Sequence, residues 1–566
     1  MRWRFPAVNF ESAERWGAAL ALPPKIAQIL IQRGLGDSAS AAKFLCPDLS
    51  DFHDPLLMAD MAAAVGRLRR AIEAREKILI YGDYDVDGTV AVVVLKTALE
   101  SLGGLVSVHV PHRMTDGYGM RATAIEEAAA EGHRVVVSVD TGIREHEAVA
   151  RARTLGLDCI ITDHHLPGPD LPPAFAILDP RRGDCLYPDK NLSGAGVAFK
   201  LVQGLLGESL SASLLGSYLQ LVAVGTVADV VPLVGENRII ARFGLEGMKE
   251  PASPGLKALL GVAGLNARQP AGVSSGQVAF RIAPRLNAAG RMQDARDVIE
   301  LLTTPRAERA AELAQRLDLL NRERQEVQDT MLAEIVARVD REPEKFAGRY
   351  SLVFSAEGWH RGVIGIVAQR VAERYYRPAV VIGLENGTAH GSGRSIPGFH
   401  LLDALTECGS LFERYGGHAQ AAGFSMHATS VGELEQRFED SCRRRLRAED
   451  LEPVLHVDAE VSFAELDAGM LRSLAKLEPH GVGNPKPVFA ARGLRVVESP
   501  RVLKEKHLKL RVAGDGRVWE ALGWNWADRA PDIHRDDHAD LAFQLDEDHF
   551  QGVTSWRLTI KDLRII

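Results

Sequence analysis

The sequence predicts an α/β protein with a parallel-sheet domain, a smaller α/β domain reached through a long helix, and a β-barrel at its C-terminal end. Three patterns predict this architecture. β-branched runs alternate with helical stretches in the first half, one long stretch lacks Gly and Pro, and short strands alternate after residue 454. The length of 566 residues exceeds what one hydrophobic core supports, so several domains are expected.

The first region predicts the parallel sheet. Between residues 77 and 232, runs such as KILIYGDYD, RVVVSVDTG and DCIITDHH alternate with helical stretches such as GTVAVVVLKTALESLG. This βαβ order is typical of a predominantly parallel sheet that is covered on both faces and binds ligands beyond the carboxyl ends of its strands. We assign residues 1–302 to an N-terminal segment and this sheet domain.

The remaining regions follow in order along the chain. The stretch AERAAELAQRLDLLNRERQEVQDTMLAEIVARV has apolar residues near helical spacing and predicts a connector helix within 303–345. A second α/β pattern gives a domain over 346–450. From 454 to 566, alternating strands such as HLKLRVAG and RVWEALGW predict a small β-barrel or sandwich.

Composition limits the function classes. No stretch approaches the roughly 18 uncharged apolar residues of a membrane helix, and the first residues do not resemble a signal peptide, so we expect a cytoplasmic protein without a membrane partner. The five cysteines form no CxxC pair, which argues against disulfides and a zinc knuckle. The net charge of −8 argues mildly against nucleic acid, but carboxylates that hold cations add to this total while creating a phosphate site.

An acidic motif follows the first predicted strand. The segment YGDYDVDG places Asp83, Asp85 and Asp87 at alternate positions, where extended chain directs side chains to one side. Hard divalent cations prefer such oxygen ligands. The alternative is an Asp-rich turn in which Asp87 caps the following helix.

Other segment ends carry matching chemistry. VSVDTG contributes Asp140, ITDHH contributes Asp163, His164 and His165, and TVADVVP contributes Asp229. Mixed carboxylate and imidazole ligands suit Mn²⁺ or a similar transition ion, with Mg²⁺ as the alternative. The full set therefore predicts a metal centre at the carboxyl edge of the sheet.

At these residues the sequence resembles the DHH phosphoesterases, a superfamily named for the triplet that is Asp163, His164 and His165 here. The resemblance implies two ions, Mn²⁺ or Mg²⁺, bridged by Asp140 and held by Asp83, Asp85, Asp87, Asp140, His164 and Asp229. One of the first three aspartates could instead only cap or orient. The catalytic residues it implies are His165, Asp140 and Asp163, with His165 contacting the phosphate or assisting proton transfer.

The resemblance narrows to the RecJ exonucleases, because YGDYDVDG, RIAPRLNAAGRM, GSGRS and GGHAQAAGF occur in their order and spacing. It covers nearly the whole chain and implies a metal-dependent enzyme that digests single-stranded DNA from the 5′ end to mononucleotides, in recombination and repair. Residues 1–302 then contain the DHH catalytic domain, 346–450 a DHHA1-like substrate-binding domain, and 454–566 an OB-fold-like barrel. The expected partners are single-stranded DNA, a single-stranded-DNA-binding protein and a helicase, and the expected state is a monomer.

A 5′-end enzyme also needs a cationic pocket for the strand terminus, for which arginine is well suited. The candidates are Arg113, Arg281, Arg285, Arg394, Ser395 and, by the family resemblance, His418. GSGRS alone could be a hairpin turn. In the last domain, the cations offered to a single strand are Lys504, Lys506, His507, Lys509 and Arg511, and the stacking faces are Trp519, Trp524 and Trp526; barrel core and a solvated face are the alternative.

Two other functions compete. Pyrophosphatases, nanoRNases and cyclic-dinucleotide phosphodiesterases resemble this chain in the metal motifs, but they lack the long helix and terminal β domain that favour a polymer substrate. A non-catalytic scaffold related to Cdc45-like proteins is the second rival. Such scaffolds tend to lose metal ligands, whereas all are present here.

Overall fold

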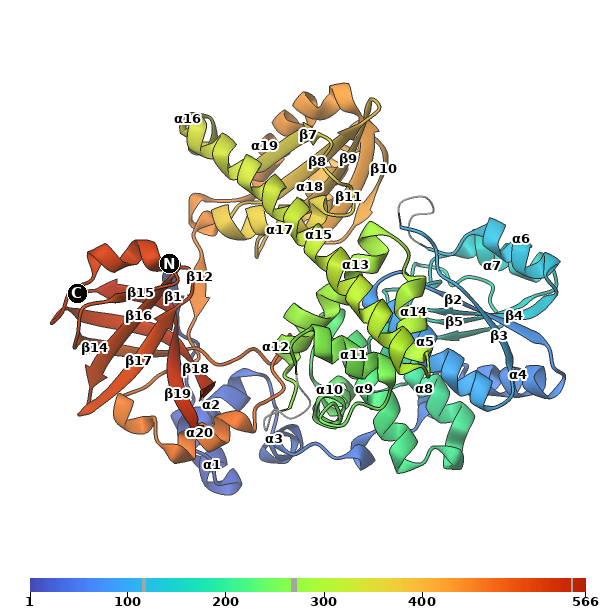
Figure 1. Ribbon diagram of the computed structural model, residues 1–566, viewed down its shortest axis with the longest axis horizontal. Helices are drawn as coiled ribbons and strands as arrows, with labels where there is room; N and C mark the ends of the chain where they lie inside the picture. The colour runs from blue at the N-terminus through green and yellow to red at the C-terminus, as the bar shows by residue number, and fades with distance from the viewer. Residues whose placement is uncertain (114–118, 266–271, 551–552) are drawn as a thin grey trace. The chain divides into compact units, whose positions relative to one another are not determined.

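The computed structural model describes residues 1–113, 119–265, 272–550 and 553–566, and the side chains of these residues outside 548–554 (Figure 1). Two compact units emerge from its contacts. The barrel unit comprises Met1–Phe52, Pro232–Arg242 and Val454–Ile566, and the two-sheet unit comprises His53–Val231 and Phe243–Pro453. Among the described residues, no helix is both long and apolar enough to cross a membrane.

The first sheet of the two-sheet unit is fully parallel, which confirms the predicted fold class. Its strand order is β3-β2-β4-β5-β6, with β2 Lys77–Gly82, β3 Leu105–His109, β4 His133–Val139, β5 Asp158–Thr162 and β6 Ala176–Leu178. Every residue from Val135 to Val139 is buried, because helices cover both faces. One face packs on α6 Ala122–Ala130 and α7 His146–Thr154. Elements on the other face are α4 Met61–Glu73, α5 Val86–Ser101 and α8 Gly194–Leu206.

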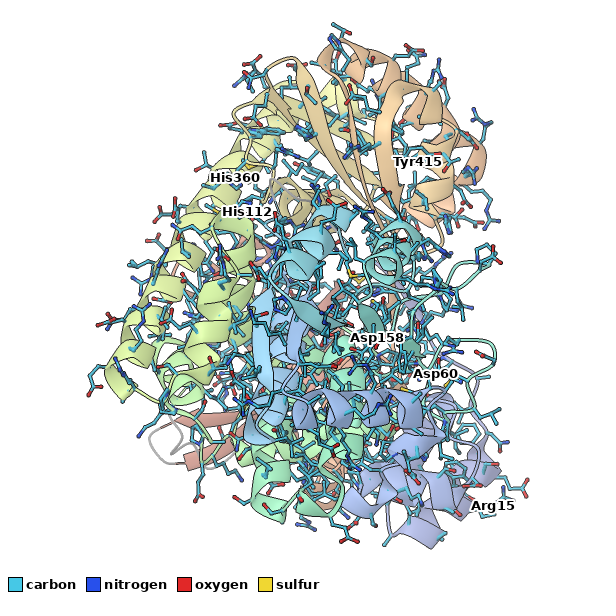
Figure 2. All side chains as sticks on the ribbon, turned by 90° about the vertical axis from the view of Figure 1, so that its right-hand side faces the viewer. Arg15, Asp60, His112, Asp158, His360 and Tyr415 are labelled. Atoms are coloured by element: carbon cyan, nitrogen blue, oxygen red, sulfur yellow. The ribbon has the colours of Figure 1, made fainter. Side chains whose placement is uncertain are left out.

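Ion pairs hold the N-terminal ends of these strands. Arg67 on α4 contacts Glu76, just before β2, at 2.7 Å and Asp158, at the start of β5, at 2.5 Å. Arg182 pairs in the same way with Asp60 at 2.7 Å. Figure 2 labels Asp60 and Asp158 on this side of the unit. Each of these carboxylates therefore has a guanidinium partner within the protein.

Further helices lead from this sheet to the long connector. They are α9 Ala212–Ala228, α10 Gly235–Gly247, α11 Pro254–Val262, α12 Ser275–Gln277, the π-helical η4 Val278–Ile282, α13 Ala283–Met292 and α14 Arg296–Thr303. The connector, α15, runs from Ala307 to Arg341, inside the predicted 303–345. It packs against both α13 and α17 Ile364–Tyr375 (Figure 1).

The second sheet has the order β10-β11-β9-β8-β7, in which only β7 and β8 are parallel. Its strands are β7 Leu352–Glu357, β8 Ala379–Glu385, β9 Thr388–Arg394, β10 Phe412–Gly417 and β11 Ala421–His427. Alternate residues of β8 face opposite cores. One core is shared with α17 Ile364–Tyr375, and the other with α18 Leu401–Thr406 and α19 Val431–Arg445.

The barrel unit contains a closed ring of five strands. β14 pairs with β18, β18 with β19, β19 with β17, β17 with β16, and β16 returns to β14. The strands are β14 Phe489–Val496, β16 His507–Gly514, β17 Arg517–Gly523, β18 His538–Phe550 and β19 Val553–Ile565, with β13 Ala459–Glu460 and β15 Arg501–Leu503 added at the sides. This ring agrees with the predicted barrel.

The first 52 residues belong to the barrel unit, whereas the sequence-based division kept them with the sheet domain. They form β1 Arg2–Arg4, α1 Phe10–Leu20, α2 Pro24–Gln32 and α3 Ser38–Leu45. Ile26 and Ile29 on α2 are fully buried in one core with Phe463 and Phe489, and β1 pairs with β12 Val454–His456. This burial stabilises the N-terminal helices only when the C-terminal residues are present.

Candidate metal centre and arginine cluster

Acidic residues meet at the carboxyl ends of the parallel strands. Asp83 follows β2, Asp140 follows β4 and Asp163 follows β5, while Asp229 lies at the C-terminal end of α9. Three groups have ligand atoms within 4.8 Å of one another: Asp83, Asp85 and Asp140; Asp87, His164 and Asp229; and Asp140, His164 and His165. The predicted ligands thus converge, and Asp140 and His164 each belong to two groups.

The three aspartates of the first motif have different local roles. Asp85 is the N-cap of α5 and accepts a hydrogen bond from the Gly88 amide at 3.0 Å. Asp87 lies inside that helix and accepts from the amides of Gly194 at 2.6 Å and Ala195 at 3.1 Å, at the start of α8. The alternative in which Asp87 caps its own helix is therefore wrong, since Asp85 is the cap and Asp87 links two helices.

Asp140 is closely enclosed by its neighbours. Its backbone is left-handed, with φ of 59°, and its side chain is buried. A Cβ at Gly194 would lie 2.5 Å from Asp140 Oδ1, so only glycine allows this approach. His164 Nε2 lies 3.1 Å from Asp140 Oδ1 and 3.6 Å from Asp229 Oδ2.

The burial of so many like charges shifts their protonation. Burial, and then the neighbouring Asp87 and Asp85, raises the pKa of Asp229 to about 9. Burial and repulsion from the other aspartates also raise the pKa of Asp83 and hold that of Asp140 well above its usual range. Burial lowers the pKa of His164 to about 3, so this imidazole is neutral and able to bind a metal.

Unsatisfied buried atoms show that these residues fit divalent cations. Within the described residues, Asp83 Oδ1, Asp140 Oδ1, Asp229 Oδ2 and both ring nitrogens of His164 are buried without a hydrogen-bond partner. Buried carboxylates without partners are costly unless they bind a cation. A set of carboxylate oxygens with one neutral imidazole suits Mn²⁺ or Mg²⁺.

Within the Asp163–His165 triplet, Asp163 is the residue that is fixed by hydrogen bonds. Asp163 accepts hydrogen bonds from the amides of Ile143 and His164, at 2.9 and 2.7 Å, and bonds His165 Nδ1 at 2.7 Å. Burial opposes a charge on His165, but the Asp163 hydrogen bond together with the charges of Asp163, Asp83 and Asp85 raises the His165 pKa. This hydrogen bond fixes the orientation of the His165 ring; the sequence predicts both Asp163 and His165 as catalytic residues.

Cationic residues gather beside the metal centre. The Arg113 guanidinium lies 5.0 Å from the ring centre of Tyr84, between two of the metal-centre aspartates in sequence. Arg394 donates to Gly393 O at 2.8 Å and Ser392 Oγ at 3.1 Å. Burial and the Arg113 charge lower the Arg394 pKa, which places these two predicted residues near each other.

Arg291 is a member of this cluster that the sequence reasoning missed. It donates to Gly362 O at 3.0 Å, and burial together with the charges of Arg113, Arg324 and Arg394 lowers its pKa to about 9. It is the last arginine of the RIAPRLNAAGRM run, so the sequence signal was present. We call Arg113, Arg291, Arg324 and Arg394 the arginine cluster.

Other predicted substrate residues lie in different settings. Arg285 contacts Asp318 at 2.9 Å, so a carboxylate already balances its charge. Arg281 is on η4, and a Cβ at Gly264 would lie 2.8 Å from its guanidinium. The Ser395 hydroxyl donates to Phe399 O at 2.7 Å within a turn. His418 lies close enough to Arg394 for that charge, after burial, to lower its pKa.

In the barrel, the three tryptophans are not equivalent. Trp519 and Trp526 pack against the core, as the alternative interpretation predicted. Trp524 is 48% exposed, contacts the His507 ring edge-on at 4.8 Å between ring centres, and has the Arg557 guanidinium 5.8 Å from its ring centre. It is the tryptophan that offers a face to solvent.

Comparison with known proteins agrees with this domain order. Models of the DHH family N-terminal domain, the DHHA1 domain and the RecJ OB domain match residues 77–226, 348–444 and 457–562. The single-stranded-DNA-specific exonuclease RecJ of Dickeya dadantii is 36% identical, over 96% of this chain and 96% of its own length. The chain belongs to the RecJ family. The RecJ exonuclease of Bacillus subtilis is 35% identical over the whole of this chain, which spans 71% of that protein.

Solved RecJ structures share the fold and contain metals. The RecJ crystal structure from Thermus thermophilus in complex with Mn²⁺ matches all of this chain with a TM-score of 0.85, at 30% identity and over 79% of its own length. A second structure of RecJ from that organism contains Mg²⁺ and matches with a TM-score of 0.79. The expected family and fold are thereby confirmed.

Proposed function

We propose that this RecJ family member is a metal-dependent exonuclease that hydrolyses single-stranded DNA from the 5′ end to mononucleotides. One observation carries the proposal. The two-sheet unit contains buried carboxylate oxygens without a hydrogen-bond partner beside a cluster of arginines that no carboxylate pairs with in the described residues. A scissile phosphate needs both features, since the carboxylates hold metals and the arginines hold phosphate oxygens.

The ligands divide naturally between two ions. Asp83 and Asp85 would hold one, Asp87, His164 and Asp229 the other, and Asp140 would bridge them. This division assigns a ligand role to Asp85 and Asp87 in addition to their hydrogen bonds at helix ends. Bound there, Mn²⁺ or Mg²⁺ supplies a hydroxide and neutralises charge on the phosphoryl group.

His165 is the residue we assign to the reacting phosphate. Asp163 fixes its ring through Nδ1, which leaves Nε2 directed away from that bond. The raised pKa favours the protonated imidazole, whose Nε2–H can donate to a phosphate oxygen and stabilise negative charge in the transition state. Asp163 acts through His165, as a positioning residue.

We assign the 5′ polarity to Arg113 and Arg394, two members of the arginine cluster. Arg113 and Arg394 come from segments far apart in the chain, and Arg291 and His418 lie near Arg394. A terminal phosphate carries more charge than an internal one, so it benefits most from several guanidinium groups. A strand anchored there by its 5′ end would be cut one nucleotide inward. Arg285 and Ser395 have structural roles in this proposal.

The barrel unit would retain the strand outside the metal centre. Trp524 offers a stacking face, and Lys504 and Lys506 on the adjoining turn are exposed cations. A role in recombination and repair, with a helicase and a single-stranded-DNA-binding protein as partners, follows from the family. A monomeric state and a cytoplasmic location remain predictions.

Strand-end labelling tests the proposed function. Purified protein with Mn²⁺ or Mg²⁺ should release labelled mononucleotide at once from 5′-labelled single strands, and only late from 3′-labelled strands, with duplex resistant. Pyrophosphate and cyclic dinucleotides serve as competing substrates for the other DHH activities. Faster turnover of either small substrate, or release from the 3′ label first, would contradict the proposal.

A further inference from the structure

A cavity of about 190 Å³ lies in the two-sheet unit directly beside the proposed metal ligand Asp229. Val227, Ala228 and Val230, the neighbours of Asp229 in sequence, form one wall. The remaining walls come from η4 and α13, from α15 and from α17. Asn287, Arg291 and Arg324 are the polar residues that line it.

Arg324 is buried in this wall without a carboxylate partner. Its side chain on α15 is 8% exposed, and its Nη atoms donate to the amide oxygens of Gln328 and Asn321, each at 3.0 Å. Its Nε has no hydrogen-bond partner within the described residues. The negative charge of Asp329 acts on Arg324 from a distance, but the Asp329 carboxylate accepts a hydrogen bond from Gln328 instead. An arginine so placed brings to the cavity wall a positive charge that no carboxylate balances within the described residues.

The backbone at Val230 also indicates that this wall is under constraint. Val230 has φ of 63°, a left-handed conformation that is unfavourable for a β-branched residue, and its side chain is 65% exposed. Residues held in such conformations cluster at ligand sites. Val230 therefore presents an apolar surface at the rim, next to the metal ligand.

We propose that this cavity is a second phosphate subsite, in which Arg324 and Arg291 bind the phosphodiester one nucleotide beyond the scissile bond. The inference rests on the proposed function. The cavity is smaller than the roughly 300–1,000 Å³ of pockets that enclose whole small molecules, which fits a phosphodiester group rather than a nucleoside. Arg324 thereby becomes a specificity residue that favours polymers over the shortest products.

Substrate length tests this assignment. A 5′-phosphorylated dinucleotide has the terminal phosphate and the scissile phosphodiester, while a trinucleotide adds the phosphodiester that Arg324 would bind. Arg324→Met should lower kcat/KM on the trinucleotide and longer strands by about ten- to a hundredfold, mostly through KM, and leave the dinucleotide unchanged. Arg324→Lys should recover part of the loss, and the salt dependence of binding should weaken by about one ion.

Two variants provide matched controls. Arg322→Gln, on the same helix, removes an arginine that is 67% exposed and pairs with Asp318, and it should leave the length dependence unchanged. Arg394→Ala should reduce cleavage of the dinucleotide and of longer strands alike. An equal loss on all lengths for Arg324→Met, or no loss on any, would overturn the inference. A wild-type protein that cut no 5′-phosphorylated strand would instead refute the proposed function, and the subsite with it.

Discussion

The acidic residues at the two edges of the parallel sheet differ in whether they have partners within the protein. At the amino ends of β2 and β5, Glu76 and Asp158 share the guanidinium of Arg67. At the carboxyl ends of the same strands, Asp83, Asp140 and Asp229 have buried oxygens without a hydrogen-bond partner within the described residues, whereas Asp163 is paired with His165. The strands and their helical covering are common to both ends, so the fold alone does not require the imbalance.

This difference separates structural charges from functional ones. An ion pair within the protein leaves no charge for a ligand, whereas an unbalanced buried charge destabilises the fold until a ligand arrives. The arginines follow the same division. Arg182 and Arg285 are paired with Asp60 and Asp318, while the arginine cluster has backbone, hydroxyl and amide partners. The unbalanced charges of both signs belong to one unit.

The largest effect should come from removing a charge at the carboxyl end. Asp140→Asn keeps a residue that tolerates the left-handed backbone, and His164→Ala removes a neutral ligand; each should lower hydrolysis about a thousandfold or more in Mn²⁺ and Mg²⁺. The fold should persist, as measured by circular dichroism and thermal unfolding.

The matched control lies at the amino end of the sheet. Arg67→Met removes the shared cation from Glu76 and Asp158, so it should lower the unfolding temperature and leave kcat/KM close to wild type. Near-normal activity of Asp140→Asn, or a loss of activity in Arg67→Met comparable to it, would remove the basis for distinguishing the two ends.

A smaller effect should distinguish the arginine cluster from paired arginines. Arg394→Ala should lower turnover by about ten- to a hundredfold on 5′-phosphorylated strands and less on 5′-hydroxyl strands, because the hydroxyl end never makes the contact. Arg285→Ala should affect both ends equally, through its structural pair with Asp318. Equal losses on both ends for Arg394→Ala would make it a general backbone contact.

The convergence of the acidic residues could be predicted because its information is local. Asp83, Asp140 and Asp163 each directly follow a strand, and the rule that parallel strands end at one edge of the sheet then brings them together. The arginines were harder to assign. The Arg285–Asp318 pair joins residues 33 positions apart, and Arg291 lies six residues after Arg285 on a helix, about 240° around its axis. The motif shows the spacing of Arg285 and Arg291, but not which of the two a distant carboxylate pairs with.

The N-terminal helices show the limit of such reasoning. Ile26 and Ile29 are apolar at helical spacing, which predicts that α2 buries a face but not against which partner. The partner core contains Phe463 and Phe489, more than 400 positions away. Deleting the residues after 453 would therefore also remove the partners of Ile26 and Ile29 and expose the apolar face of α2. A point substitution is the cleaner test of the barrel.

Trp524→Ala is that substitution. It should weaken binding of long single strands by about tenfold, since stacking of one base contributes roughly 1–3 kcal/mol, and leave cleavage of short oligonucleotides and the unfolding temperature unchanged. Trp519→Ala, which removes a side chain packed on the core, should instead lower the unfolding temperature. Unchanged affinity of Trp524→Ala for long strands would place the strand on another face of the barrel.

The smallest expected effect is on stability. It tests whether the carboxylates at the carboxyl ends of the parallel strands lack compensating positive charge before metal binds. The raised pKa of Asp229, about 9 against roughly 3.9 for an unfolded aspartate, means that the metal-free folded protein binds more protons than the unfolded chain between these values. Its stability should therefore fall as pH rises from about 6 to about 8. Mn²⁺ binds the deprotonated carboxylates, so the difference in unfolding temperature between Mn²⁺ and EDTA samples should widen by a few degrees over the same range.

Asp140→Asn removes one of the mutually repelling charges and should flatten both trends, whereas Arg67→Met should preserve them at a lower unfolding temperature. A difference that stays constant with pH in the wild type would show that the carboxylates are balanced by protein groups, as they are at the amino end.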